Sequence, residues 1–259
     1  MAGLINIQRA GGNAVSAFMN TRGSFELLGS SLRSLGALRL APVRQVLYRQ
    51  VYFTGIEAMT KVTAVGALIG IVIITQVANI VGFNAVLAGK IFVWVVVREL
   101  APLFSAIIII ARSSTAVASE LGSMQVNGEI RTLRIMGIDP VAYLVVPRIL
   151  GMALCVYVLA FYFQLGAAIG GLILSSLFLD IQFLQQLGNI FTALSFLEMS
   201  VSLIKSLLFG FIIASTSCYH GLNVRSSITE IPQATSRAVM QCLVLVILFD
   251  GIITMVFFV

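Results

Sequence analysis

The chain has 259 residues, of which 59% are hydrophobic and only 10% charged, and its formal net charge is +6. Soluble domains carry about 25% charged residues, so this composition excludes an ordinary soluble protein and predicts an integral membrane protein. No Pro-, Ser- or charge-rich stretch looks like a linker, and we expect one domain over 1–259. The basic residues flank apolar runs, as orientation signals do, so we do not expect nucleic-acid binding.

The N-terminal segment 24–61 has the pattern of helices that lie along a membrane surface. Apolar residues recur at three- and four-residue intervals over 25–38, with Arg33 and Arg39 outside that stripe. This one-sided pattern predicts an interfacial helix. After Pro42 a second amphipathic stretch is expected to follow the interface before the chain turns into the membrane. A soluble N-terminal subdomain is the alternative, although the segment is short for one.

Five apolar stretches are long enough to cross a bilayer core, which takes about 20 helical residues. The predicted spans cover about residues 64–83, 91–112, 149–176, 196–219 and 238–258. Glycines in the first span (Gly66, Gly70) and the third (Gly166, Gly170, Gly171) form small faces that permit close helix contact. The sequence therefore predicts an all-α membrane protein.

The distribution of Lys and Arg predicts the orientation of these spans. The basic residues gather before span one, between spans two and three, and between spans four and five. By the positive-inside rule the N-terminus is cytoplasmic, and an odd number of spans then puts the C-terminus outside. The segment after span two is therefore cytoplasmic. Within it, the amphipathic residues 119–136, followed by Gly137 and Pro140, predict a cytoplasmic helix.

Four charged residues lie well inside the predicted spans, away from the span ends: Arg98, Glu99, Lys205 and Asp250. A charged side chain at the bilayer centre costs at least about 2.5–3.5 kcal/mol, so such residues are candidates for a functional site. The structural alternative is a salt bridge that only locks the helices together. Adjacent residues on an α-helix point about 100° apart, so we expect Arg98 and Glu99 to have separate partners.

The sequence lacks the residues for several kinds of catalysis. His220, the only histidine, lies at a predicted membrane boundary, so we expect neither a Ser-His-Asp triad nor a His-rich metal site within one chain. The three cysteines have no metal-ligand spacing. The phosphate-binding motif G-x-x-x-x-G-K-[ST] is missing from the sequence. We therefore expect no enzyme activity and no cofactor in this chain.

Several short motifs resemble those of the MlaE family of ABC-transporter permeases. They are Arg98-Glu99-Leu100-Ala101-Pro102, Glu120-Leu121-Gly122-Ser123-Met124, Met136-Gly137-Ile138-Asp139-Pro140 and Pro147-Arg148. The resemblance extends to Gly70 and Gln76, to Lys205-Ser206 and to residues 231–237, and covers residues 25–258. One position departs: where the family commonly has Glu-Gln, this chain has Gly128-Glu129.

The resemblance implies a homodimeric permease with an N-terminal interfacial helix, five spans and a cytoplasmic coupling helix seated on a separate ATPase, which holds the ATP and Mg. In Gram-negative relatives, two permeases, two ATPases, a small STAS-domain protein and a hexameric MCE-domain periplasmic protein move glycerophospholipids between the inner and outer membranes. The expected location is the cell inner membrane. The expected substrate is a phospholipid, held in the cavity of the permease dimer.

Two sets of candidate residues follow from this resemblance. Glu99 and Arg98 are expected to face the lipid head group, supported by Lys205. Acyl-chain contacts are expected at Ile73, Val77 and Ile80, although ordinary packing or contact with bulk lipid would explain the same pattern. The expected ATPase-coupling residues are Glu120, Leu121, Met124, Glu129, Ile130, Arg131, Leu133 and Arg134.

Two other functions fit the same composition. A secondary transporter or channel would use the buried charges as an ion relay, and a membrane-embedded enzyme would act on lipids directly. We see no internal repeat of the kind that secondary transporters often show. The single histidine argues against the enzyme.

Overall fold

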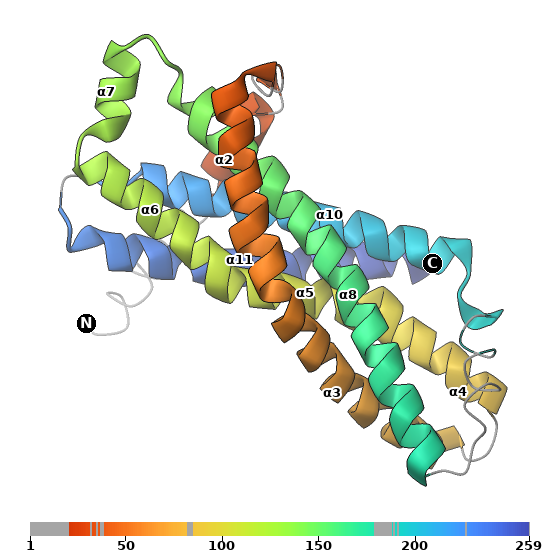
Figure 1. Ribbon diagram of the computed structural model, residues 1–259. Coiled ribbons are helices and arrows are strands. Elements are labelled where there is room, and N and C mark those ends of the chain that lie inside the picture. The colour runs from red at the N-terminus through yellow and green to blue at the C-terminus, as the bar shows by residue number, and fades with distance from the viewer. Residues whose placement is uncertain are drawn as a thin grey trace, which may run out of the picture. The chain divides into compact units, whose positions relative to one another are not determined.

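The computed structural model describes residues 21–258 apart from 32, 35, 37, 38, 82–84, 179–187, 189, 191 and 226. Every regular element in this described part is a helix (Figure 1). Five helices are long and apolar enough to cross a membrane: Ala41–Val81, Val86–Val126, Val141–Ile173, Phe196–Leu222 and Glu230–Phe257. Their number matches the five spans predicted from the sequence.

The first of these helices is longer than the sequence pattern indicated. It consists of α2 (Ala41–Val51), the π-helical segment η2 (Tyr52–Ile56) and α3 (Glu57–Val81), which follow one another without a break. Pro42 lies in its first turn, where a missing backbone N–H is tolerated. Residues 21–31 form a separate helix before it. Whether 24–61 lies in the membrane surface stays a prediction, and the predicted end of span one at 83 lies outside the described residues.

The second long helix contains two π-helical segments. Its parts are α4 (Ala85–Phe92), η3 (Val93–Leu100), α5 (Ala101–Ile109), η4 (Ile110–Ser114) and α6 (Thr115–Val126). Pro102 cannot donate a hydrogen bond to the carbonyl of Arg98, and the wider turn of η3 directly precedes it. The helix therefore continues through the proline, and it extends well beyond the predicted span of 91–112.

The predicted single helix over 119–136 is wrong. Its first part is the end of α6, and its second part is a separate short helix, α7 (Glu129–Ile135). Gly128 has φ 76° and Gly137 has φ 77°, values that glycine adopts readily and other residues rarely do. After α7, Ile138 N–H donates to Leu133 O and Gly137 N–H donates to Arg134 O, which is a Schellman motif.

The remaining helices agree more closely with the predicted spans. They are η5 (Val141–Val145), α8 (Val146–Phe178), α10 (Phe196–Leu222) and α11 (Glu230–Phe258). The last of these begins at Glu230, before the predicted start of span five at 238. Pro232 lies in its first turn, a position that proline favours.

The described residues form two compact units. Unit 1 contains those of 21–47, 110–150 and 211–245, and unit 2 contains those of 48–109, 151–210 and 246–258. Several long helices contribute residues to both units. The single MlaE-type permease domain expected over 1–259 stays a prediction.

In unit 2, the backbones of α3 and α8 pack in close contact. At Gly66, Gly70, Gly166 and Gly170 an added Cβ would overlap a backbone carbonyl of the facing helix. Gly171 faces Gly70 across the same contact. Only glycine lets two helix backbones approach this closely. The glycine faces predicted for the first and third spans are therefore the two sides of one contact, which we call the glycine seam.

Unit 1 contains a buried group of neutral polar side chains, Ser114, Ser217 and Cys242, which we call the hydroxyl–thiol core. Ser217 Oγ lies 2.7 Å from Ser114 Oγ and 2.6 Å from the carbonyl oxygen of Ile213. Cys242 Sγ lies 3.7 Å from that same oxygen. This core therefore joins residues of η4, α10 and α11 through uncharged groups.

Candidate functional site

Five ionisable side chains of unit 2 lie together and form the charge cluster. They are Arg98 and Glu99 of η3, Glu198 and Lys205 of α10, and Asp250 of α11. Unpaired charges are costly among membrane-spanning helices, and here every charged member of the cluster lies near an opposite charge. The sequence placed Arg98, Glu99 and Lys205 in one site, and the structure brings all three together.

Lys205 is the centre of the cluster, and its side chain is fully buried. Its Nζ lies 2.6 Å from Glu99 Oε2, 2.7 Å from Thr254 Oγ1 and 3.0 Å from Asp250 Oδ1. The Thr254 hydroxyl lies 3.0 Å from Glu99 Oε2 as well. The ammonium thus joins three helices through two hydrogen bonds and an ion pair.

Arg98 occupies the other half of the cluster. Its Nη1 lies 3.6 Å from Glu198 Oε1, and its Nη2 donates to the carbonyl oxygen of Phe257 at 3.1 Å. Arg98 and Glu99 thus have the separate partners that we expected, Glu198 and Lys205, yet Arg98 Nε also lies 3.6 Å from Glu99 Oε1. The cause is the π-helical turn, in which successive side chains diverge less than in an α-helix.

Polar neighbours hold the cluster in place. Trp94 Nε1 donates to Glu198 Oε1 at 3.1 Å. Gln164 Nε2, from the facing helix α8, lies 3.3 Å from the carbonyl oxygen of Val97 and 2.8 Å from Ser202 Oγ. These contacts satisfy polar groups that would otherwise be exposed to an apolar surrounding.

The three residues expected to touch acyl chains do not share one environment. Val77 is 5% exposed and packs inside unit 2, while Ile80 is 80% exposed and Ile73 is intermediate. A different part of unit 2 offers a more continuous apolar surface, a hollow of about 420 Å³ between η2, α3 and α8. Its lining is Val51, Gly55, Ile56, Met59, Leu154, Cys155, Val158, Leu159 and Tyr162. Gly55 keeps it open, because a Cβ there would come within 3.0 Å of Cys155 Sγ.

The residues expected to meet an ATPase are divided between α6 and α7 in unit 1. Leu121 is completely buried and Ile130 nearly so, so neither can seat in a groove of a partner. Glu120, Met124 and Glu129 do line one hollow of about 650 Å³, which we call the α6–α7 hollow. The rest of its lining is Ser119, Ser123 and Ile231. Glu120 Oε1 also lies 3.1 Å from Arg148 Nη2. The exposed surface that a partner could contact is thus smaller than the predicted set of ATPase-coupling residues.

The other members of that set lie on α7 and its end. Arg131 and Arg134 are exposed, and Leu133 is half-buried. Beyond them, Ile135 and Met136 are strongly exposed apolar side chains that were not among the predicted ATPase-coupling residues. The break between α6 and α7 at Gly128 explains the change, because α7 does not continue the helix face predicted for 119–136.

Comparison with known proteins identifies the family. Residues 47–256 match the family model described as Permease MlaE. The chain belongs to the MlaE permease family. A probable ABC transporter permease protein of Rickettsia conorii is 27% identical over 260 residues, which covers 98% of this chain and 99% of the relative.

Two further relatives come from photosynthetic organisms. A probable ABC transporter permease protein of Synechocystis is 30% identical over 220 residues, which covers 83% of this chain and 82% of the relative. The chloroplastic protein Trigalactosyldiacylglycerol 1 of Arabidopsis thaliana is 31% identical over 163 residues, covering 62% of this chain and 46% of the relative. The chain is therefore an ABC transporter permease and a multi-pass membrane protein.

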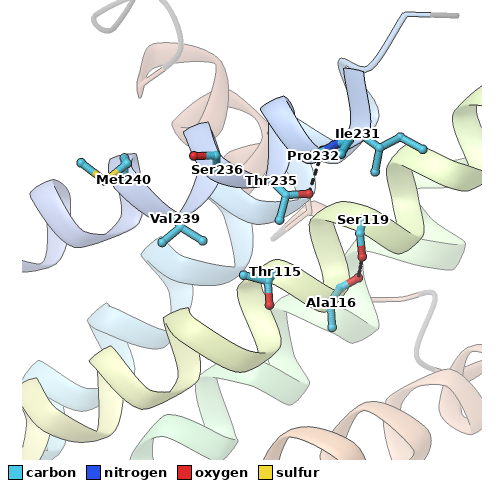
Figure 2. A pocket seen from close by; sticks show the side chains of 9 residues that line it. All are labelled: Thr115, Ala116, Ser119, Ile231, Pro232, Thr235, Ser236, Val239 and Met240. Atoms are coloured by element: carbon cyan, nitrogen blue, oxygen red, sulfur yellow. Dashed lines mark hydrogen bonds between the residues drawn. The ribbon is translucent and has the colours of Figure 1, made fainter. Parts of the chain in front are cut away.

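A groove beside the α6–α7 hollow of this MlaE permease has a volume of about 620 Å³. Figure 2 shows it between α6, which contributes Thr115, Ala116 and Ser119, and α11, which contributes residues from Ile231 to Met240. Its hydroxyls turn back to their own helices: Ser119 donates to Ala116 O, and Thr235 donates to Ile231 O. The groove is therefore more apolar than its composition suggests.

Sequence reasoning missed one member of the charge cluster of this permease, Glu198, and did not connect another, Asp250, to the rest. Glu198 stands at the polar start of α10, where an acidic residue ordinarily faces water or complements the helix dipole. Asp250 was noticed, yet nothing in the sequence joined it to Lys205. The remaining unassigned residue, His220, lies in unit 1, where its Nε2 is hydrogen-bonded to Gln241 Oε1 at 2.5 Å.

Proposed function

We propose that this MlaE permease is the membrane component of an ATP-driven phospholipid transporter in which two copies of the chain enclose the lipid. The observation that carries the proposal is the charge cluster, a polar site within helices that are otherwise apolar enough to span a membrane. A phospholipid needs such a combination, because its charged head group must leave water while its chains stay among apolar side chains. The name of the Arabidopsis relative refers to a glycerolipid, which supports this substrate class.

Within this proposal the two ends of the lipid meet different parts of unit 2. The head group approaches Glu99, with Arg98 and Lys205 behind it. An acyl chain enters the apolar hollow between η2 and α8, or runs along the exposed side chain of Ile80. Both surfaces belong to a unit held together by the glycine seam.

Energy for transport enters from a separate ATP-binding subunit, because the chain carries no phosphate-binding loop of its own. That subunit holds the ATP and Mg and contacts the α6–α7 hollow, where two carboxylates flank Met124. Exposed Ile135 and Met136 supply apolar contact area. An MCE-domain periplasmic protein and a small STAS-domain protein complete the complex in the cell inner membrane.

The decisive experiment is reconstitution of the permease, with the ATPase that co-purifies with it, into vesicles containing fluorescent phospholipid. We expect lipid movement only with hydrolysable ATP. Movement driven by an ion gradient without ATP would instead favour the ion-relay transporter. Absence of both an ATPase partner and lipid movement would overturn the proposal.

The contact with the ATPase is tested at Glu129, an exposed residue that lines the α6–α7 hollow. Glu129→Lys is expected to weaken capture of the ATPase by purified permease more than Glu129→Ala, because a reversed charge opposes its former partner. Glu57→Lys, at an exposed position in unit 2, is the matched control. Full ATPase capture by Glu129→Lys would remove Glu129 from the interface.

The proposed orientation places the N-terminus in the cytoplasm and the C-terminus in the periplasm. Cysteine tags fused at each end are expected to react with a membrane-impermeant thiol reagent in intact spheroplasts only at the C-terminus. Reaction of both ends, or of neither, would contradict an odd number of spans.

A further inference from the structure

We infer that the charge cluster selects phospholipids whose head group ends in a primary ammonium, and that the Glu99 carboxylate binds this ammonium. The inference rests on the proposed function, since it specifies the lipid for the same site. It follows from three features of the cluster: its net charge, the exposure of its members, and its unused hydrogen-bonding atoms.

The cluster carries more negative charge than positive. Its members are two cations, Arg98 and Lys205, and three carboxylates, those of Glu99, Glu198 and Asp250. With all five ionised, the net charge is −1. An uncompensated charge among apolar helices is unfavourable, and a cation supplied by the ligand would balance it.

The side chains of the two cations are less exposed than those of the three carboxylates, of which Glu198 is 11% exposed. The side chain of Lys205 is 0% exposed and that of Arg98 is 5% exposed. Asp250 is 17% exposed and Glu99 is 27% exposed, the largest value in the cluster. A ligand that reaches this site therefore meets a carboxylate before it meets a cation.

The donors of both cations are already directed at partners within the unit. The ammonium of Lys205 donates to Glu99 Oε2 and Thr254 Oγ1 and forms an ion pair with Asp250 Oδ1 at 3.0 Å. Arg98 is directed at Phe257 O and toward the carboxylates. A lipid phosphate would have to displace these partners to be bound by either cation. Lys205 thus acts as a positioning residue, which holds the Glu99 carboxylate in place.

The carboxylates of the cluster, in contrast, have oxygen atoms that accept no hydrogen bond. Glu99 Oε1, Glu198 Oε2 and Asp250 Oδ1 are buried atoms that accept no hydrogen bond from any residue that the structure describes. Buried acceptors are ordinarily satisfied, and an unsatisfied carboxylate oxygen is especially unfavourable. Among the buried donor atoms of the described cluster, only Arg98 Nε likewise makes no hydrogen bond, so three such acceptors stand against one donor and the site is short of donors.

Head groups differ in how they meet this need. An ethanolamine head group ends in a primary ammonium with three N–H donors and one positive charge. A choline head group has the charge but no N–H donor, and a glycerol head group leaves the phosphate charge unbalanced. The expected order of preference is ethanolamine, then choline, then glycerol.

The test uses the full-length permease, purified in detergent and equilibrated with an equimolar mixture of phosphatidylethanolamine, phosphatidylcholine and phosphatidylglycerol. Bound lipids are quantified by mass spectrometry. For the wild type we expect the ratio of ethanolamine to glycerol lipid to exceed that of the mixture about tenfold, as one charge-assisted contact would give. Glu99→Gln, which keeps the shape and removes the charge, is expected to abolish this enrichment.

Two further variants separate this role from a structural one. Glu99→Asp keeps the charge and is expected to restore most of the enrichment, whereas Glu57→Gln, in the same unit but exposed, is expected to leave it unchanged. An equal ratio in the wild type and Glu99→Gln, with lipid still bound, would overturn the inference and leave the proposed function standing. Absence of phospholipid from the wild type would instead count against the proposed function. The wild type alone tests the inference if Glu99→Gln fails to fold. Enrichment of glycerol lipid over ethanolamine lipid on the wild-type permease would contradict the inference.

Discussion

The charge cluster of unit 2 and the hydroxyl–thiol core of unit 1 are both polar groups buried among membrane-length helices, yet they are built differently. In the core, Ser114, Ser217 and Cys242 are neutral, and each reaches a hydroxyl or a backbone carbonyl nearby. In the cluster, five charged groups share partners at distances up to 3.6 Å, and three carboxylate oxygens accept no hydrogen bond within the described chain.

We interpret the hydroxyl–thiol core as a group that fixes helix packing, and the charge cluster as the proposed lipid-binding site. Neutral groups that satisfy one another fix the positions of helices at little cost in desolvation. Charged groups are expensive to bury, and an incompletely satisfied set gains stability when a ligand completes it. The completeness of hydrogen bonding, more than polarity itself, points to the site that binds a ligand.

The largest expected effect is that of Lys205→Met, which removes the central cation and leaves the carboxylates of Glu99 and Asp250 facing each other. Loss of one partner of a buried ion pair costs about 3–5 kcal/mol. We expect a much lower midpoint of thermal unfolding in detergent and a low yield of folded permease. Lys205→Arg is the control, which keeps the charge. Wild-type stability of Lys205→Met would mean that the cluster does not stabilise the fold as an ion-paired set.

A smaller loss is expected from Gly70→Ala, which tests the glycine seam that supports the cluster from the apolar side. The added methyl group would meet the backbone of Ala167, and overpacking of this kind costs about 1–3 kcal/mol. Gly251→Ala is the matched control in the same unit, because nothing lies within 4 Å of its added Cβ. The unfolding midpoint should fall only for Gly70→Ala, and equal midpoints would contradict the close contact of α3 and α8.

The smallest effect belongs to the hydroxyl–thiol core. Ser217→Ala removes a hydroxyl that lies within hydrogen-bonding distance of Ser114 Oγ and Ile213 O, for an expected loss of about 0.5–1.5 kcal/mol. The ratio of bound ethanolamine to glycerol lipid should stay at the wild-type value. A change in that ratio would show that the core takes part in lipid selection, and the contrast between the two regions would fail.

The amino-acid sequence by itself determined the class of protein, the number of spans and the two glycine faces of α3 and α8. These follow from properties that are local along the chain, namely apolar length and the small size of particular residues. It also placed Arg98, Glu99 and Lys205 in a site, because a charge inside a span is conspicuous wherever it occurs. The family motifs were visible in the same way.

Only the tertiary structure decided which groups meet. Asp250 and Glu198 join the cluster because α10 and α11 bring them to η3, and no spacing along the chain records that approach. Leu121 is buried within unit 1, where the sequence pattern had suggested a free surface, since a helix shows the same apolar stripe whether its own fold or a partner covers it. The turn at Gly128 likewise depends on a backbone conformation that glycine permits but does not require. Contacts between distant segments are set by packing, and packing is not a local property of the chain.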